Sequence, residues 1–337
     1  MVAQPGFACA FAHHRRIPRV LNRLVALVIA AGAMLNCSAA TAHGIAGNRL
    51  FPGTLSFDDP AVSDEFALTP SWVSKQAADG SAVTDKGVGW QFMRLLLPNL
   101  AAVVNSGFIH RDWPQLQRNG FDGTTVSLKG QLYESDPHEV LLSAEMSWGI
   151  GGSGSSAVGA IEPNIFQPAL YFGKGFGDLP DRFEWLRPFA LTGELAIEIP
   201  AVSRSTILGA NSASSALVSM PHENVPILHW GFSIQYSTYY LTSRFTGGPP
   251  KQEPLNQFVP IVEFAFDSPR GQGTIANMSP GVAYVATTWQ LAVEAVLPLN
   301  AASGHGVGVR AQLLLFLDDL APSLFGKPLL SQARGVQ

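Results

Sequence analysis

Apolar and polar residues alternate along several long stretches of this chain. In residues 227–240, one face of an extended chain carries Leu228, Trp230, Phe232, Ile234, Tyr236 and Tyr240, and the other carries His229, Ser233, Gln235 and Ser237. A period of two residues is typical of a β-strand with one apolar and one polar face. The rhythm recurs in EVLLSAEMSW, PFALTGELAIEI, WQLAVEAVL and VGVRAQLLLFL. It predicts an all-β fold, a single antiparallel transmembrane β-barrel.

The period-two segments and the turn signals between them predict about twelve strands, with a range of roughly 10 to 14. The barrel is expected over residues 67–318, after an irregular segment at 43–66 and before a tail at 319–337. Residues 92–104 are apolar at nearly every position, and we assign them to strands although their periodicity does not exclude a short helix. The expected strands are 68–76, 85–95, 99–111, 124–133, 139–149, 166–176, 187–199, 227–242, 256–266, 274–285, 287–297 and 306–317.

Loop lengths suggest which end of the barrel faces outward, because outer-membrane barrels have short periplasmic turns and longer outer loops. Ser135, Asp136 and Pro137 predict a short periplasmic turn. Outer loops are then expected near 149–164, 200–225 and 298–305. The connection at 243–255 would lie on the periplasmic side, although it is longer than this rule favours. The segment 43–66 is expected in the periplasm or in the lumen, and so is the tail.

The first 42 residues have the features of an export signal. Four arginines, at 15, 16, 19 and 23, precede an uncharged stretch that ends in the small-residue segment SAATA. Cleavage is expected after Ala42. A lipoprotein signal at Cys37 fits less well, because the bulky Asn36 precedes it. A twin-arginine signal is also disfavoured, because Ile17 and Pro18 follow the arginine pair.

Composition supports an exported membrane protein without spanning helices. Charged residues make up 14% of the chain, against roughly 25% in soluble domains, and no stretch after residue 42 approaches the roughly 18 apolar residues of a spanning helix. Loss of four arginines lowers Lys plus Arg from 21 to 17 against 25 acidic residues, so the mature charge is about −8. That charge argues against a nucleic-acid partner. Cys9 and Cys37 precede the cleavage site, which excludes an internal disulfide in the exported chain.

Parity along the strands identifies candidate lumen-lining positions. A basic side chain on the lipid face at mid-bilayer would cost roughly 2 to 4 kcal/mol, so charged residues within strands are expected to point inward. Five glutamates against one lysine and one arginine predict a lumen that disfavours anions. The alternative is that these charges pair across strands and hold a filled barrel together. The candidates are Lys129, Glu145, Glu194, Glu198, His229, Gln235, Glu263, Gln290, Glu294, Arg310 and Gln312.

Several motifs can be interpreted either as ordinary structural elements or as binding or catalytic sites. GIGGSG at 149–154 matches a dinucleotide-binding fingerprint by letter, but no helix is expected after it, so an outer loop is favoured. The acidic residues at 58, 59, 64 and 65 are interpreted as a solvated segment rather than a calcium site. Glu134, Asp136, His138 and Glu139 are interpreted as a turn rather than a metal site. His229 lies too far along the strand from Ser233 for a catalytic pair, and neither catalysis nor a cofactor is expected.

Three segments carry a resemblance to a known family. They are HGIAGNRLFPGTLSFDDPAVSDE at 43–65, YESDPHEVLLSAEMSWGIGGSG at 133–154 and the block 279–320, which begins SPGVAYVATTWQLAVEAVLPLN. Together they resemble uncharacterised proteobacterial outer-membrane barrels that are similar to the transporter-like proteins of the meta-pathway of phenol degradation. The resemblance implies an outer-membrane channel for small, hydrophobic or aromatic solutes, with lipid and the barrel-assembly machinery as partners.

Two other hypotheses stay open at this point. The barrel could be plugged and serve a structural or binding role without transport. It could instead be a soluble periplasmic barrel of lipocalin type, which would require its apolar faces to point inward around a ligand.

Overall fold

The structure, a computed structural model, describes residues 44–76, 82–114, 116–160, 163–210, 217–246 and 255–330. All of them lie in the second of two units, Cys37–Gln337. The predicted signal peptide, its cleavage site and both cysteines lie outside the described residues, as do residues 331–337. No helix among the described residues is long and apolar enough to cross a membrane.

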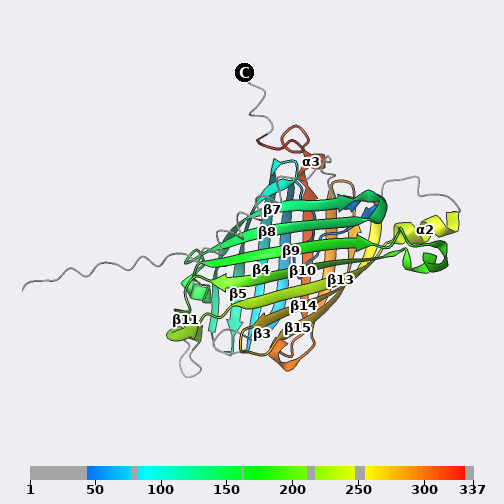
Figure 1. Cartoon of the computed structure of the whole chain (residues 1–337). Coiled ribbons are helices and arrows are strands. Elements are labelled where there is room, and N and C mark those ends of the chain that lie inside the picture. The colour runs from blue at the N-terminus through cyan, green and yellow to red at the C-terminus, as the bar shows by residue number, and fades with distance from the viewer. Residues whose placement is uncertain are drawn as a thin grey trace, which may run out of the picture. The chain divides into compact units, whose positions relative to one another are not determined.

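The alternating segments form a closed antiparallel barrel with 12 strands, which confirms the predicted fold (Figure 1). The barrel closes because β3 pairs with β17 and β4 pairs with β5. β6 and β7 occupy one strand position, since both pair with β5 and a two-residue interruption separates them. The barrel strands are β3 (Glu65–Gln76), β4 (Ala82–Leu97), β5 (Leu100–Trp113), β6 (Leu116–Phe121), β7 (Thr124–Ser135), β8 (Val140–Ile150), β9 (Ile165–Gly175), β10 (Phe189–Pro200), β13 (Ile227–Tyr236), β14 (Gln257–Pro269), β15 (Ile275–Val285), β16 (Trp289–Pro298) and β17 (Gly308–Phe316).

Apolar side chains point outward from this barrel. On β13, Leu228, Trp230 and Ile234 are each more than a third exposed, whereas Ser233 and Gln235 are buried. The same division holds on β16, where Leu291 and Val293 are exposed and Gln290, Ala292 and Glu294 are buried. A soluble ligand-binding barrel needs the opposite orientation, so the lipocalin alternative fails on its own criterion. The outward apolar surface is that of an outer-membrane β-barrel.

Aromatic side chains mark both ends of the apolar surface. At one end, Trp148 stacks on Phe166 and Trp230 stacks on Phe266. At the other end, Phe258, Tyr284 and Trp289 lie in contact on three successive strands. Aromatic rings at two levels are typical of the two interfaces of a bilayer.

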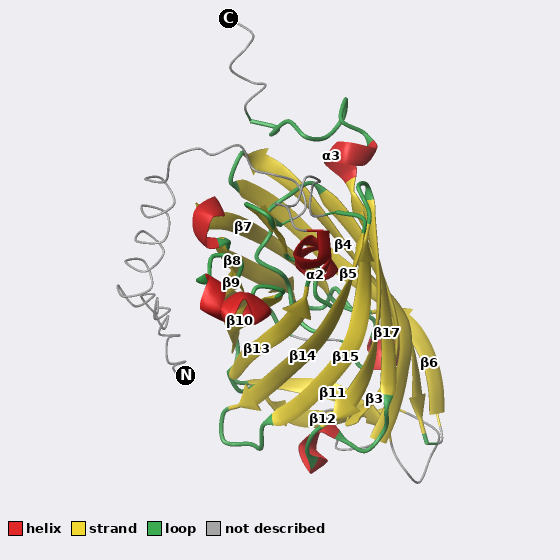
Figure 2. Ribbon diagram, turned by 90° about the vertical axis from the view of Figure 1, so that its right-hand side faces the viewer, coloured by secondary structure: helices red, strands yellow, loops and turns green. Residues whose placement is uncertain are grey.

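The two ends of the barrel differ in their connections (Figure 2). One end carries the short turns β4–β5, β7–β8 and β15–β16, with η1 (Asp136–His138) in the second and α3 (Leu317–Leu320) after β17. It also carries η3 (Asp181–Leu186) and α2 (Thr238–Thr246) in two longer connections. The opposite end carries η2 (Ser156–Val158), the hairpin of β11 (Arg204–Ala210) with β12 (Leu217–Glu223), and η4 (Ala301–Ser303).

The structure differs from the sequence expectations at two places. The strand predicted for 227–242 ends at Tyr236, because the chain leaves the sheet where the Ser237 hydroxyl donates to Gln257 Oε1 at 2.9 Å, and α2 follows. Tyr240, expected on the apolar strand face, lies instead against Arg49. The region 200–225, expected as a loop, contains the β11–β12 hairpin. Its alternation is interrupted by Ser and Pro residues, which hid it.

Residues 44–64, here called the inserted segment, fold into the lumen. The segment begins with β1 (Ile45–Ala46) and β2 (Arg49–Leu50), which pair with each other. It hydrogen-bonds to strands on opposite sides of the barrel, among them β7 through Lys129 and β14 through Glu263. Of the two locations expected for this region, the structure shows the lumen for residues 44–64.

Candidate functional site: the lumen and its inserted segment

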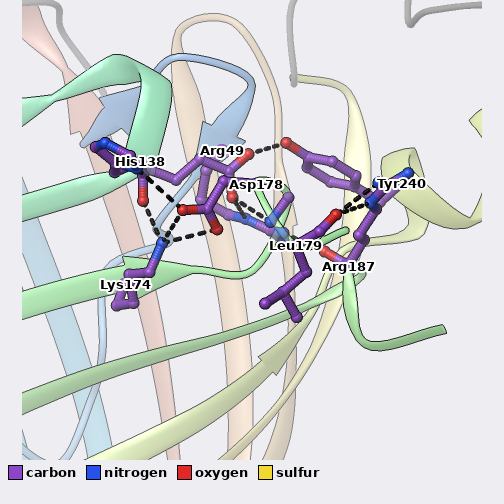
Figure 3. Close-up of polar contacts among 9 residues, drawn as sticks. Arg49, His138, Lys174, Asp178, Leu179, Arg187 and Tyr240 are labelled. Atoms are coloured by element: carbon purple, nitrogen blue, oxygen red, sulfur yellow. Dashed lines mark hydrogen bonds and ion pairs between the residues drawn. The ribbon is translucent and has the colours of Figure 1, made fainter. Parts of the chain in front are cut away.

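Arg49 anchors the inserted segment where it enters the barrel (Figure 3). Its guanidinium lies 3.2 Å from Glu139 Oε2, donates to the Pro188 carbonyl at 3.1 Å, and stacks 4.2 Å from the ring centre of Tyr240. Tyr240 also donates its hydroxyl proton to Glu139. Burial lowers the pKa of Arg49, and Glu139 opposes this shift. Three connections of the α3 end, β7–β8, β9–β10 and β13–β14, therefore converge on one buried cation.

Neighbouring contacts hold the β9–β10 connection in place for this anchor (Figure 3). Lys174 and His138 bond to Asp178 at 2.9 and 3.2 Å, and the Arg187 Nε donates to the Leu179 carbonyl at 2.8 Å. Burial alone would raise the pKa of Asp178, but the hydrogen bonds from Lys174 and His138 lower it overall. The predicted turn at Glu134–Glu139 is therefore a turn in which His138 and Glu139 stabilise the neighbouring connections.

Amide and carboxylate side chains of β14, β16 and β17 bind the backbone of the inserted segment. Gln290 Oε1 accepts a hydrogen bond from the Gly53 N–H, and Gln290 Nε2 donates to the Gly53 carbonyl, both at 3.0 Å. Gln290 Nε2 also donates to Gln312 Oε1 at 3.0 Å. Glu263 accepts the N–H groups of Leu55 at 3.0 Å and Ser56 at 2.7 Å. A segment without regular structure needs such partners, because buried backbone groups are costly when unpaired.

Arg310 and Glu294 pair across neighbouring strands at 3.3 Å, as the pairing alternative expects. Arg310 Nη1 also donates to Ser56 Oγ at 3.1 Å. Glu294 is almost completely buried and Arg310 is partly exposed. The pair joins the wall to the inserted segment and leaves part of the guanidinium facing open space.

Lys129 pairs with the inserted segment rather than with another strand. Its ammonium lies 2.8 Å from Asp58 Oδ2 and 2.7 Å from the Asp59 carbonyl, and the side chain is fully buried. At the end of the segment, Asp64 is paired with Arg94 and accepts the Leu95 N–H at 2.6 Å. The acidic residues 58, 59, 64 and 65 were interpreted as solvated, and this was wrong: they fold into the lumen, where Lys129 and Arg94 compensate Asp58 and Asp64.

Residues 324–327 of the tail lie against the α3 end of the barrel. Arg94 Nη2 donates to the carbonyls of Leu324 and Lys327 at 3.2 and 3.0 Å, and the Gly326 N–H donates to Asp64 at 2.9 Å. The ring of Phe325 lies 5.1 Å from the guanidinium of Arg94. Arg94 therefore connects the tail to the end of the inserted segment.

Glycines of the wall make room for two aromatic rings of the inserted segment. Phe51 lies against Gly173 of β9, and Phe57 lies against Gly231 of β13, so that an added Cβ would meet each ring at 3.0 to 3.1 Å. Both glycines occupy inward positions. The segment thus packs closely on the β7–β10 and β13–β17 sides of the lumen.

On the β3–β5 side, the inserted segment leaves two cavities. One of about 330 Å³ lies between Leu55, Arg310 and the strands β3–β5. A second, of about 310 Å³, lies beside residues 54–59 and extends to Glu65. The two share Leu55, Thr69, Gly89, Asn105 and Ser106. They therefore form neighbouring spaces along one wall.

The remaining candidates lie on the other walls. Glu145 is buried beside Lys129 in the β7–β8 register, and Gln235 donates to Ser233 Oγ at 3.0 Å. His229 lies 2.7 Å from Asp267 and 3.3 Å from Glu198, and Glu194 is half-buried. Ser233 contacts Thr192 at 2.6 Å, and His229 is not among its hydrogen-bond partners in the described part of the chain. Whether any of the eleven candidates lines a conducting passage stays a prediction.

The cavity wall was not among the positions predicted from the sequence, because the candidates were chosen for charge or strong polarity. The inward positions of β3–β5 beside the cavities are instead Thr69, Ser71, Gly87, Gly89, Gln91, Asn105 and Gly107. A run of small and neutral polar residues at inward parity was the available signal. Within the described residues, no group of three or more His, Cys, Asp or Glu residues could hold a metal ion.

Comparisons with known proteins show likeness to other barrels. No protein-family model and no curated protein matches the chain, so the resemblance to the meta-pathway barrels stays a prediction. Among solved structures, the NanC porin is 6% identical, with a TM-score of 0.41 over 74% of this chain and 98% of that one. The β domain of the Bordetella autotransporter BrkA is 11% identical, with a TM-score of 0.45 over 75% and 98%. A deletion mutant of TodX, a monoaromatic hydrocarbon channel, is 7% identical, with a TM-score of 0.35 over 75% and 89%. Function does not carry over at such low identity.

Proposed function

We propose that this protein is an outer-membrane channel that passes small solutes along the β3–β5 wall, beside the inserted segment. The two adjoining cavities of about 330 and 310 Å³ carry this proposal. Together they extend from Glu65, near the α3 end, to Ile109 and Gly123 in the opposite half. The α3 end, where most turns are short, would face the periplasm. The apolar outer surface would contact lipid after insertion by the barrel-assembly machinery.

Charge in the lumen favours cations and neutral solutes over anions. Asp58, Asp59 and Glu65 border the second cavity, and Arg310 borders the first. Arg310 is paired with Glu294 and Asp58 is paired with Lys129, so the acidic excess beside the cavities comes from Asp59 and Glu65. Rings of carboxylates are a common basis of cation preference in pores. Exclusion of anions was also the expectation from the inward glutamates.

The alternative is a plugged barrel without transport. It is supported by the dense contacts between the inserted segment and the walls that carry Lys129, Glu263 and Gln290. The two functions differ in whether the space on the β3–β5 side conducts.

Substitution at Gly89 tests the proposed route. An added Cβ at Gly89 would meet no atom closer than the Thr69 carbonyl oxygen at 3.9 Å, so a side chain there enters the shared space without disturbing the fold. Wild-type protein in a planar bilayer should conduct, and Gly89→Leu should reduce its conductance several-fold. Gly130→Leu is the control, because Gly130 faces outward beside Leu100 and has comparable room, with its nearest atom at 3.6 Å. An inactive wild-type protein would support the plugged alternative. An unchanged conductance in Gly89→Leu would refute the route.

A further inference from the structure

Inward polar side chains around the lumen differ in their hydrogen-bond partners. On the walls that hold the inserted segment, several of them bond to that segment, as Gln290 does to Gly53 and Glu263 to Ser56, although the buried Ser127 Oγ has no hydrogen-bond partner among the described residues. On the β3–β5 wall, by contrast, Thr69, Ser71, Gln91 and Asn105 make no side-chain hydrogen bond with a described residue. Thr69 and Asn105 border both cavities, Ser71 borders the first and Gln91 borders the second. Unsatisfied polar groups that surround a cavity need a partner from solvent or from a bound molecule.

From this asymmetry we infer that the passage binds small, neutral, hydroxyl-rich solutes of the monosaccharide class. The inference rests on the proposed function and names its solute. Hydroxyl and amide side chains each donate and accept hydrogen bonds. Hydroxyl groups of a sugar do the same, so four such side chains on one wall match a polyhydroxylated surface.

The other solute classes fit this lining less well. An anion would meet Asp58, Asp59 and Glu65 at the second cavity. A hydrophobic or aromatic solute would cover Thr69 and Asn105 without bonding to them, and a covered, unpaired polar group costs about 1 to 3 kcal/mol. The hydrophobic or aromatic solutes implied by the sequence resemblance are therefore disfavoured by this wall.

The dimensions also suit a single sugar ring. Each cavity lies near the lower end of the range for small-molecule pockets, roughly 300 to 1,000 Å³. Gly87, Gly89 and Gly107 leave the wall flat between the polar side chains. A flat wall lets several hydroxyl groups reach the strands at once.

Xylose permeation into proteoliposomes, measured beside ion conductance in planar bilayers, tests the inference. Thr69→Val removes a hydroxyl group at nearly constant volume, and Asn105→Leu removes an amide. Each should weaken xylose uptake or xylose block of the ion current roughly five-fold, which corresponds to the loss of one hydrogen bond. Thr84→Val is the control, because Thr84 bonds to Ser74 at 3.1 Å on the outer face of the same strand pair.

The outcomes separate the two proposals. Ion conduction in wild-type protein without xylose uptake or block would overturn the monosaccharide assignment and leave the channel standing. Equal xylose behaviour in wild type, Thr69→Val and Asn105→Leu would also overturn it. Absence of ion current in wild-type protein would refute the channel, and the solute assignment with it.

Discussion

Lys129 Nζ lies 2.8 Å from Asp58 Oδ2, which joins the barrel wall to a residue 71 positions earlier in the chain. The lysine side chain is 0% exposed and the aspartate is 21% exposed. The same ammonium donates to the Asp59 carbonyl. This contact holds residues 58 and 59 of the inserted segment against the β7 wall.

Removal of the Lys129 cation should destabilise the barrel markedly. Lys129→Met leaves the carboxylate of Asp58 without its partner, and breaking a buried pair in this way costs about 3 to 5 kcal/mol. The measurement is the free energy of unfolding in urea, with the folded fraction at each urea concentration determined from the gel shift between folded and heat-denatured protein. Lys86→Met is the matched control, since Lys86 is half exposed in its 2.7 Å pair with Asp112 and should contribute at most about 1 kcal/mol. Equal losses in the two variants would contradict the assignment.

Loss of the Arg49 anchor should loosen the entry of the inserted segment. Arg49→Gln removes the cation from Glu139 and the stacking on Tyr240. Amide hydrogen exchange at Phe51 and Gly53 should become at least ten-fold faster, because their hydrogen bonds to Gly44 and Gln290 open more often. Arg182→Gln, at the stacked pair of Arg182 and Phe183 in η3, should leave these rates unchanged. Unaltered exchange in Arg49→Gln would show that the segment is held elsewhere.

Mild acid should strengthen the fold through Asp59. Burial raises the pKa of Asp59 from 3.8 to about 6, and Lys129 only partly offsets the shift. Between these two values the folded protein holds a proton that the unfolded chain has lost, so the free energy of unfolding rises as pH falls through this window. We expect a gain of about 1 kcal/mol from Asp59 between pH 7 and pH 5. Asp59→Asn should flatten the profile, and an equally steep profile in that variant would assign the effect to other groups.

Alternation was sufficient to predict the barrel because each strand carries its own signal. In β13 and β16, outward apolar residues alternate with inward residues along the sequence, and this pattern does not depend on the neighbouring strands. The inserted segment has no such rhythm. Its path is set by partners far along the chain, such as Glu263 for Leu55 and Gln290 for Gly53, which are 208 and 237 residues away. Tyr240 continued the alternation of β13 but left the sheet, because its contacts with Glu139 and Arg49 lie beyond the membrane end of that strand.

The lumen walls also differ in how far the sequence predicts their role. Inward charge drew the sequence prediction to Lys129 and Glu294, both of which contact the inserted segment. The space that we propose to conduct lies beside neutral residues such as Thr69 and Asn105, whose importance appears only once the inserted segment has been placed. The predicted boundaries at 43–66, 67–318 and 319–337 stay a prediction, with β3 beginning at Glu65 and β17 ending at Phe316.

Cysteine accessibility tests the conducting route most directly. In a background with Cys9 and Cys37 replaced by serine, Asn105→Cys places a thiol on the shared cavity wall. Ser143→Cys places one on the opposite side, where Ser143 is fully buried against the Pro60 carbonyl. A cationic methanethiosulfonate reagent should rapidly and irreversibly reduce the current of Asn105→Cys and leave that of Ser143→Cys intact. A conducting channel in which Ser143→Cys reacts as fast as Asn105→Cys, or in which Asn105→Cys does not react, would contradict the account.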